Sequence, residues 1–265
     1  MLVMLCFDLS TQAQTKLAPL PLYEQCASLT EEPSETLQRD LAALKGSDAT
    51  ARAAAVKQLS QACRQQAVEP LLDLLRSEDT QTRIAAIETL GRLGSKEAVE
   101  PLRELTGDPD WRVRLALVPA LASFKTFQAK NAVLNSIVIP ADVDVSDEQD
   151  MRVRCIGILT LNQLTDVTFS RKGVQFLTNV LRSNRLNIRA LAEETMYALK
   201  DTRNGPSELI GILKQHNMPE MRRWACEWLG KLGIERARPA LEEAAANDVN
   251  AAVKYAAAEA LAKLK

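Results

Sequence analysis

The sequence predicts an all-α fold, a right-handed solenoid of about seven helix pairs, from three observations. Apolar residues make up 46% of the 265 residues but aromatic residues only 4%, which favours a core of Ala, Leu, Val and Ile between closely packed helices. One amphipathic segment recurs seven times along the chain, and a second amphipathic segment precedes each copy. Helices that cannot bury their apolar faces alone stack against neighbouring copies, and such stacking builds a solenoid.

The recurring segment is built on a basic residue with a large apolar residue seven positions later. The residue one position before the basic residue is mostly apolar, and the residue three positions after it is small or apolar. Because these positions lie on one helix face, we expect that face to point into the core. Small residues such as Ala55, Ala86, Ala192 and Ala225 then let a neighbouring helix approach closely. The basic residues are Arg52, Arg83, Arg114, Arg154, Arg189, Arg222 and Lys254.

The other helix of each pair shows Leu or Val at helical spacing and ends in a polar turn. Two copies of the recurring helix are followed by Gly94 and Gly233, which suit the left-handed conformation that ends a helix. We expect the solenoid to cover residues 34–265, with an acidic insertion at 139–150 that explains the longest spacing between copies. The expected first helices span residues 34–48, 67–79, 98–110, 127–138, 171–183, 206–215 and 238–248.

Residues 1–33 are expected to form a poorly ordered leader. The leader begins MLVMLCFDLSTQAQ, whose apolar run is too short to span a bilayer and follows no basic region. A degenerate signal-like or lipoprotein-like leader and a true start at Met4 are the alternatives. No other segment is apolar enough to cross a membrane, and a net charge of −1 gives no basis for binding nucleic acid or an anionic membrane.

Four aspartates stand four positions before a basic residue of the repeat. A row of carboxylates for a metal is one interpretation. The other is structural, either as helix N-caps or as an Asp–Arg ladder between successive pairs, and recurrence with the fold period favours it. The set comprises Asp48, Asp79, Asp110 and Asp150 with Arg52, Arg83, Arg114 and Arg154.

The segment Asp79–Gly94 carries the pattern D-x-x-T-R-x-x-A-I-x-x-L-G-x-L-G, and Glu97–Leu102 continues it with E-A-V-x-P-L. Arg222–Gly233 repeats the second half of the pattern. This pattern resembles the HEAT-like repeats of phycobilisome bilin-lyase-type proteins, over roughly residues 35–265. The resemblance implies a HEAT-like α-solenoid that serves as a lyase subunit, a phycobilisome-degradation factor, an iron–sulfur assembly partner or a scaffold. The copies at 154–161 and 189–196 depart from it, because they lack the Leu-Gly-x-Leu-Gly ending.

The sequence offers no set of catalytic residues. His216 is the single histidine, lies in an expected turn and accompanies no nucleophile motif. One histidine also excludes a metal site with several His ligands and hence a resemblance to deoxyhypusine hydroxylase. The acidic insertion lacks the glycine and glutamate of a calcium loop. We therefore expect a non-enzymatic protein without a metal or a resident cofactor.

The five cysteines are odd in number, widely spaced and without a Cys-x-x-Cys pair, which predicts no disulfide framework and a reducing, cytoplasmic setting. Cys63 takes the place of the glycine that ends other copies of the helix, and Cys226 takes a buried apolar position. A cluster shared with a partner, or a bilin in transit, is the alternative role. The cysteines are Cys6, Cys26, Cys63, Cys155 and Cys226.

Two tryptophans stand out in the copy that begins at Arg222. Trp224 and Trp228 are four residues apart, at positions where the other copies carry small or mixed residues, so we expect a partly exposed stripe there. Together with Arg222 or Arg223, the two indoles form a candidate binding patch for a protein partner or a planar anionic tetrapyrrole. Packing between neighbouring helices is the alternative for at least one indole.

These observations favour a non-catalytic scaffold that binds a protein partner on the concave face of the solenoid. A subunit of a phycobilin lyase, or a bilin-detaching factor acting on phycobiliproteins, is the first alternative, on the resemblance and the Trp–Arg patch. A partner in iron–sulfur cluster assembly is the second, on the cysteines alone.

Overall fold

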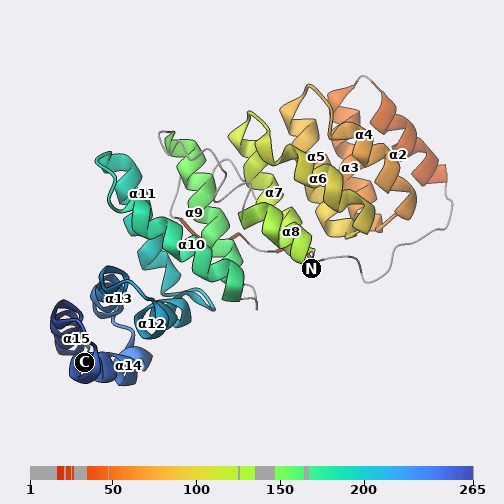
Figure 1. Ribbon diagram of the computed structural model, residues 1–265. Helices are drawn as coiled ribbons and strands as arrows, with labels where there is room; N and C mark the ends of the chain where they lie inside the picture. Colours follow the sequence, from red (N-terminus) through yellow and green to blue (C-terminus); the bar gives the residue numbers. More distant parts are fainter. Residues whose placement is uncertain are drawn as a thin grey trace. The chain divides into compact units, whose positions relative to one another are not determined.

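The computed structural model describes residues 17–20, 22–24, 26, 35–46, 48–124, 126–134, 147–163 and 167–264 (Figure 1). These residues form fourteen α-helices, α2 to α15, and no β-strand. The chain divides into two compact units, residues 1–160 and 161–265, and each is described by itself. The predicted all-α solenoid of seven helix pairs is confirmed.

The first helix of each pair is the shorter one in the N-terminal half of the chain. The predicted spans 67–79 and 98–110 are too long, because both helices begin after a 3-10 turn and end early. After α6 the chain leaves helical geometry at Leu105, where a second 3-10 turn leads to Asp108, and Pro109 keeps Asp108 out of the α region. The first helices are α2 (Glu35–Lys45), α4 (Val68–Leu74), α6 (Val99–Glu104), α8 (Phe127–Ala132), α10 (Val167–Val180), α12 (Gly205–Gln215) and α14 (Arg238–Asn247). The 3-10 turns are η1 (Gln65–Ala67), η2 (Lys96–Ala98), η3 (Leu105–Gly107) and η5 (Glu235–Ala237).

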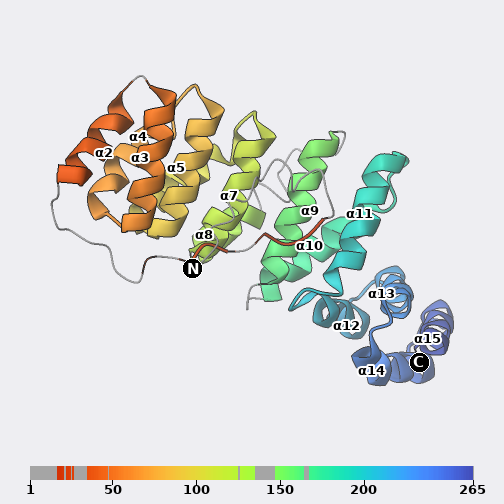
Figure 2. The same ribbon diagram turned by 180° about the vertical axis from the view of Figure 1, so that it is seen from behind.

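The second helices carry the recurring basic residue. In unit 1, α3, α5 and α7 lie side by side, as Figures 1 and 2 show. Gly94 and Gly233 end α5 and α13 in the left-handed conformation, with φ of 68° and 63°, and Cys63 ends α3 in the same way with φ of 49°. The second helices are α3 (Ala49–Ala62), α5 (Thr80–Leu93), α7 (Trp111–Ser123), α9 (Glu148–Asn162), α11 (Leu186–Leu199), α13 (Pro219–Leu232) and α15 (Ala251–Lys263).

The predicted inward face of the second helices is buried. Ala55, Ala86, Ala192 and Ala225 are each no more than 2% exposed. The large apolar residues seven positions after the basic residue are buried in six copies, and Leu261 of α15 is half-buried. The small residues bring neighbouring helices together, and Gly230 lies so close to Ala260 that a Cβ atom on Gly230 would be 2.8 Å from the Ala260 Cα.

The stripe that we expected to be partly exposed is mostly buried. Thr89, Ala120, Thr160 and Thr195 lie six positions after the basic residue and are each no more than 3% exposed. The expectation was wrong for α5 and α7 because these second helices pack directly against each other, so that Thr89 and Ala120 lie at or near their contact. Only in α3 are both positions of the stripe exposed.

Part of the expected leader packs against unit 1, contrary to our expectation for residues 1–33. Leu17 and Leu20 are 1% and 4% exposed. Leu20 N donates to Thr160 Oγ1 at 3.0 Å, and Tyr23 N donates to Ser123 Oγ at 2.8 Å. We name residues 17–26 the strap; its described residues appear as the red trace in Figure 2. Residues 1–16 lie outside the described part of the chain.

A disulfide fixes the strap at its C-terminal end. Cys26 Sγ and Cys63 Sγ are 2.07 Å apart, and the two residues are separated by 37 positions in the sequence. The prediction of no disulfide framework did not foresee this bond, and the bond removes the argument for a reducing compartment that rested on the cysteines. The pairing was missed because an extended segment gives no helical pattern that would place Cys26 beside the end of α3.

The acidic insertion at 139–150 lies largely outside the described residues. The structure describes it only from Asp147, which precedes α9, and Glu148, Gln149 and Asp150 form the first turn of that helix.

Candidate partner-binding surface

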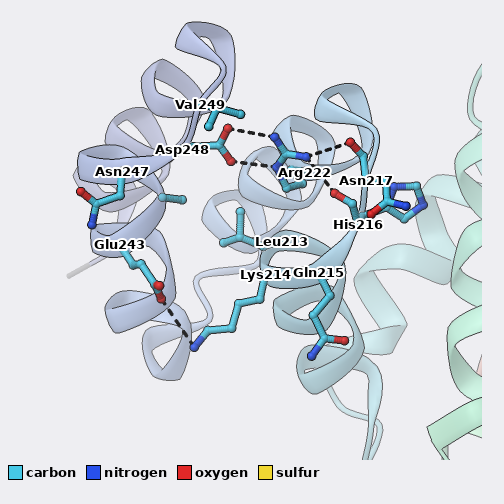
Figure 3. Close-up of a pocket in the computed structure, with 11 residues that line it drawn as sticks. Leu213, Lys214, Gln215, His216, Asn217, Arg222, Glu243, Asn247, Asp248 and Val249 are labelled. Carbon is cyan, nitrogen blue, oxygen red and sulfur yellow. Dashed lines mark hydrogen bonds and ion pairs between the residues drawn. The ribbon is translucent and has the colours of Figure 1, made fainter.

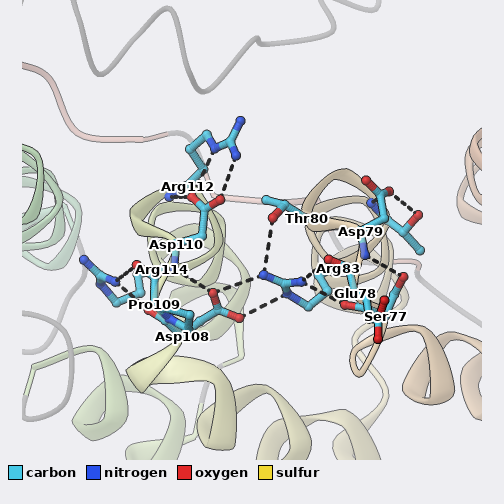
Figure 4. Close-up of polar contacts among 11 residues, drawn as sticks. Ser77, Glu78, Asp79, Thr80, Arg83, Asp108, Pro109, Asp110, Arg112 and Arg114 are labelled. Atoms are coloured by element: carbon cyan, nitrogen blue, oxygen red, sulfur yellow. Dashed lines mark hydrogen bonds and ion pairs between the residues drawn. The ribbon is translucent and has the colours of Figure 1, made fainter.

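The recurring arginine holds the loop before its own helix and reaches into the next repeat. Arg83 Nη1 donates to the carbonyl oxygens of Ser77 and Glu78 at 2.8 and 3.1 Å (Figure 4). Its Nη2 donates to Asp108 Oδ1 at 3.2 Å, and Asp108 begins the loop before α7. One guanidinium therefore fixes two successive loops, which sets the spacing between neighbouring pairs.

The same arrangement recurs twice more. Arg114 donates to the Pro109 carbonyl at 3.2 Å and to Asp150 Oδ1 at 2.8 Å. In unit 2, Arg222 donates through Nε and Nη2 to the two carboxylate oxygens of Asp248, at 2.8 and 2.9 Å. Arg222 Nη1 also donates to the carbonyl oxygens of His216 and Asn217, at 2.8 and 3.1 Å.

The predicted aspartates divide between the two structural roles. Asp48, Asp79 and Asp110 are the N-caps of α3, α5 and α7, and each side chain accepts from backbone N–H groups of the first helical turn. Asp150 is not a cap, because α9 begins two residues before it and Asp147 Oδ1 accepts from Asp150 N. Asp150 instead pairs with Arg114 and, within α9, with Arg154 at 2.6 Å.

The remaining predicted arginines differ in their partners. Arg52 Nη1 donates to the Gly46 carbonyl oxygen, six positions earlier, at 2.6 Å. Arg154 is buried, with its side chain 5% exposed beside Asp150. Neither of these contacts leads to the next repeat.

The ladder uses two aspartates that the sequence reasoning missed. Asp108 and Asp248 stand six positions before Arg114 and Lys254, whereas the predicted set stands four positions before. For these two partners the signal was an aspartate six positions before the basic residue, whereas the third partner, Asp150, stands four positions before Arg154. The pair is buried in both cases: Arg83 and Asp108 side chains are 12% and 6% exposed, and Arg222 and Asp248 are 12% and 8% exposed. The hydrogen bonds from Arg222 lower the pKa of Asp248.

A cleft of about 580 Å³ opens beside this ladder in unit 2 (Figure 3). Its lining includes His216, Arg222 and Asp248, together with Lys214 and Glu243, which form an ion pair at 3.8 Å. His216 Nδ1 accepts from Met218 N at 3.1 Å, so this nitrogen shapes the turn. The eleven lining residues include no Ser, Thr or Cys that could act as a nucleophile beside the histidine. The cleft is therefore a gap between two turns that the ladder holds at a fixed distance.

The predicted Trp–Arg patch does not form one exposed surface. Trp228 is 4% exposed and packs beneath Tyr197, with ring centroids 5.5 Å apart in an edge-to-face arrangement. The Arg222 guanidinium binds the Asp248 carboxylate of the ladder. Arg223 is half exposed and pairs with Glu227 on the same helix at 3.2 Å.

An aromatic surface remains in unit 2, although its members differ from those predicted. Trp224 is half-buried, with its ring centroid 6.3 Å from that of Trp228, and Tyr197 is 54% exposed. Lys231 places its ammonium nitrogen 4.7 Å from the centre of the Trp228 ring. We name Tyr197, Trp224, Trp228 and Lys231 the aromatic platform. Tyr197 was missed because it belongs to α11, the helix beside α13, so that no spacing within one repeat links it to the tryptophans.

The strap buries ionisable groups in unit 1. Burial and the nearby Glu88 carboxylate raise the pKa of Tyr23 well above its usual 10. Burial also raises the pKa of Glu88 from 4.5 to about 7, and the nearby Arg92 guanidinium opposes this shift in part. The folded protein therefore binds more protons at Glu88 than the unfolded chain between pH 4.5 and 7. This group lowers the stability of the fold as the pH rises through that range.

Substitution of Glu88 by glutamine is expected to raise the free energy of unfolding by about 1 kcal/mol at pH 8 and to leave it unchanged at pH 4. The reason is that glutamine resembles the protonated carboxyl group, which the folded state favours. Urea unfolding at both pH values measures the difference. An equal effect at both values, or destabilisation at pH 8, would contradict the assignment.

The two described cysteines outside the disulfide are buried. Cys155 and Cys226 are each 0% exposed. Burial is also the main reason why the pKa of the Cys226 thiol rises to about 12. A thiol in this state is a poor nucleophile and a poor metal ligand, so its packing explains its presence.

The two buried thiols are expected to resist alkylation. In the native protein at pH 8, iodoacetamide should modify Cys155 and Cys226 at least 100-fold more slowly than in the protein unfolded by urea, because both thiols are buried and the reagent reaches them only after opening. Mass spectrometry of tryptic peptides measures both rates. Modification of either residue at the rate of a free thiol would show that it is accessible and reactive.

Two further features of the described residues bear on function. No three His, Cys, Asp or Glu side chains within them gather closely enough to hold a metal ion. None of the helices in this part of the chain has the length and apolarity needed to span a membrane.

The family model for HEAT repeats matches residues 39–122, 69–145 and 174–262, and so covers most of the chain. The chain belongs to the HEAT repeat family. This confirms the resemblance to HEAT-like repeats, and the arginine ladder and the small-residue contacts are thus features of its HEAT repeats. No curated protein sequence matches the chain.

Several solved HEAT-like or related repeat structures are similar to this chain. The complex of CpcE and CpcF of phycocyanin lyase from Nostoc sp. PCC7120 is 22% identical, with coverage of 91% of this chain and 92% of that one and a TM-score of 0.42. A HEAT-like repeats protein from the archaeon Thermococcus onnurineus NA1 is 12% identical, with coverage of 88% and 98% and a TM-score of 0.39. Human deoxyhypusine hydroxylase is 17% identical, with coverage of 88% and 85% and a TM-score of 0.32.

Proposed function

We propose that this HEAT repeat protein is a non-catalytic scaffold that binds a protein partner through the aromatic platform. The observation that supports the proposal is the exposure of Tyr197, 54%, on top of an indole that is itself buried. Tyr and Trp side chains that stand on a rigid, desolvated base are typical of the residues that dominate binding energy at protein interfaces. Lys231 gives the platform one positive charge suited to a carboxylate on the partner.

The test is a quantitative capture experiment with a double variant, Tyr197→Ala with Trp224→Ala. We expect the partner retained by the wild type to bind the double variant at least tenfold more weakly, because two anchoring rings are lost. Tyr255→Ala is the matched control, since Tyr255 is 70% exposed and is not a member of the platform. Trp228 is left in place because its removal would open a cavity. Equal capture by all three proteins would reject the platform as the contact.

A second candidate function is the binding of an open-chain tetrapyrrole, as expected of a bilin lyase subunit or a bilin-detaching factor. The observation that favours it is the ammonium group of Lys231 beside the clustered aromatic rings of the platform, because a bilin is planar and carries carboxylates. Titration with phycocyanobilin should then shift the bilin absorbance in the wild type and not in the double variant. An unchanged spectrum removes this candidate. Handling of an iron–sulfur cluster receives no support from the buried Cys155 and Cys226.

A further inference from the structure

The strap is an extended segment that unit 1 binds through regularly spaced backbone hydrogen bonds. Three of its backbone N–H groups donate to three successive second helices: Leu20 to the Thr160 hydroxyl of α9, Tyr23 to the Ser123 hydroxyl of α7, and Cys26 to the Arg92 carbonyl of α5. The three distances are 3.0, 2.8 and 2.9 Å. The strap therefore runs antiparallel to the order of the repeats.

The distance that three residues of the strap span matches the distance between neighbouring second helices. Three residues of an extended polyproline-like chain span about 9 Å, and packed helices lie about 8–10 Å apart. At every third position the strap is covered: Leu17 and Leu20 are buried and Tyr23 and Cys26 are half-buried, whereas Ala18, Leu22 and Glu24 are exposed. Pro19 favours the extended conformation and donates no hydrogen bond. The strap thus advances by one repeat for every three residues.

Small residues of unit 1 make room for the strap. A Cβ atom on Gly91 would lie 2.8 Å from the Tyr23 ring and 3.0 Å from Ala120, so the ring rests beside a close contact between α5 and α7. We name the surface formed by Gly91, Ala120, Ser123 and Thr160 the strap groove. At the corresponding positions α11 carries Thr195 and Tyr197, and α13 carries Trp228, Gly230 and Lys231; the larger residues among them belong to the aromatic platform.

We propose that the strap groove is a binding site for an extended, proline-containing peptide segment with an apolar side chain at every third residue. The strap is its intramolecular occupant, and a segment of a partner with the same pattern binds there when the strap is displaced. The groove supplies two side-chain hydroxyls and one carbonyl that accept from backbone N–H groups, so it selects the extended conformation and the threefold spacing. Because the groove lies in unit 1, this site is independent of the aromatic platform.

The strap competes with such a segment at high effective concentration. It is joined to α2 by a few residues and to α3 by the Cys26–Cys63 disulfide. Tethers of this kind give effective concentrations in the millimolar range, so an unlinked segment binds the wild type poorly. Removal of the anchors from the strap should therefore reveal the site.

The experiment measures fluorescence anisotropy of a labelled peptide, Leu-Ala-Pro-Leu-Pro-Leu-Tyr-Glu-Gln-Ser, on the full chain. The strap-open variant carries Leu20→Asp, Tyr23→Asp and Cys26→Ser. We expect the peptide to bind this variant with a Kd on the order of 10–100 μM and to bind the oxidised wild type at least tenfold more weakly. A peptide with aspartate in place of its second Leu and its Tyr should not bind. Addition of Ser123→Ala to the strap-open variant should weaken binding about fivefold, through loss of one hydrogen-bond acceptor.

A second measurement tests the proposal even if the strap-open variant does not fold. In the ¹⁵N-labelled single variant Cys26→Ser, an excess of the unlabelled peptide should accelerate hydrogen exchange of the Leu20 and Tyr23 amides at least fivefold, as the peptide replaces the strap. Absence of binding to a folded strap-open variant, or unchanged exchange in the single variant, would overturn the proposal. Neither result depends on Tyr197 or Trp224, so the proposed function is tested separately.

Discussion

Substitution of Arg222 by alanine is expected to lower the free energy of unfolding of unit 2 by about 3 kcal/mol. The guanidinium makes two hydrogen bonds to the Asp248 carboxylate and two to the carbonyl oxygens of His216 and Asn217. Its removal leaves the Asp248 carboxylate, 8% exposed, without its cation. Removal of one partner of a buried ion pair lowers the free energy of unfolding far more than replacement of both partners by apolar residues would. The reason is that the remaining charge stays buried without its partner.

Arg238→Ala is the matched control for this prediction. Arg238 pairs with Glu235 at 3.0 Å, but both side chains are well exposed, at 39% and 53%. The expected loss for Arg238→Ala is below about 0.5 kcal/mol, because solvent screens the exposed pair. Urea unfolding followed by circular dichroism compares the two variants. Equal effects of Arg222→Ala and Arg238→Ala would show that the ladder contributes no more than a surface ion pair.

Substitution of Gly230 by alanine is expected to destabilise unit 2 by about 2 kcal/mol, although alanine is the better helix former. The added methyl group would stand 2.8 Å from the Cα and 3.0 Å from the Cβ of Ala260, and neither atom is the end of a flexible side chain. The helices α13 and α15 would have to separate. The Gly230→Ala variant therefore tests directly the close approach of neighbouring helices that the repeat pattern predicts.

The control lies in the same unit and also within a helix. A Cβ atom on Gly211 of α12 would meet only the end of the Arg171 side chain, at 3.6 Å, which is an ordinary contact. Gly211→Ala should therefore stabilise the protein by up to about 1 kcal/mol through helix propensity. Thermal unfolding should show a lower midpoint for Gly230→Ala and a higher midpoint for Gly211→Ala than for the wild type. Stabilisation by both substitutions would mean that α13 and α15 are farther apart than the structure places them.

The sequence predicted the repeating part of the fold because the same face of the same helix recurs. Ala86 and Ala225 occupy one position in two copies, and equal burial follows from equal packing. The caps Asp79 and Asp110 were predictable for the same reason, since a cap acts within its own turn. The role of Asp150 was less clear, because one position can serve either its own helix or the neighbouring repeat, and only the start of α9 decides between them.

Contacts that the repeat does not encode escaped the sequence reasoning. Tyr197 and Trp228 meet across two helices, so neither residue alone indicates an aromatic cluster. The strap has no helical period, and its own signal, an inward residue at every third position from Leu17 to Cys26, is meaningful only beside the spacing of the helices. The disulfide between Cys26 and Cys63 depends on that same alignment.

Amide hydrogen exchange of the strap, resolved by residue with NMR, tests most directly whether unit 1 holds an extended peptide on its second helices. In the oxidised wild type, the amides of Leu20, Tyr23 and Cys26 should exchange at least 100-fold more slowly than in an unfolded chain, because each donates to a different helix. The amides of Ala18, Leu22 and Glu24 should exchange fast, since these residues face solvent. Uniform fast exchange across residues 17–26, or protection without the threefold pattern, would contradict the account.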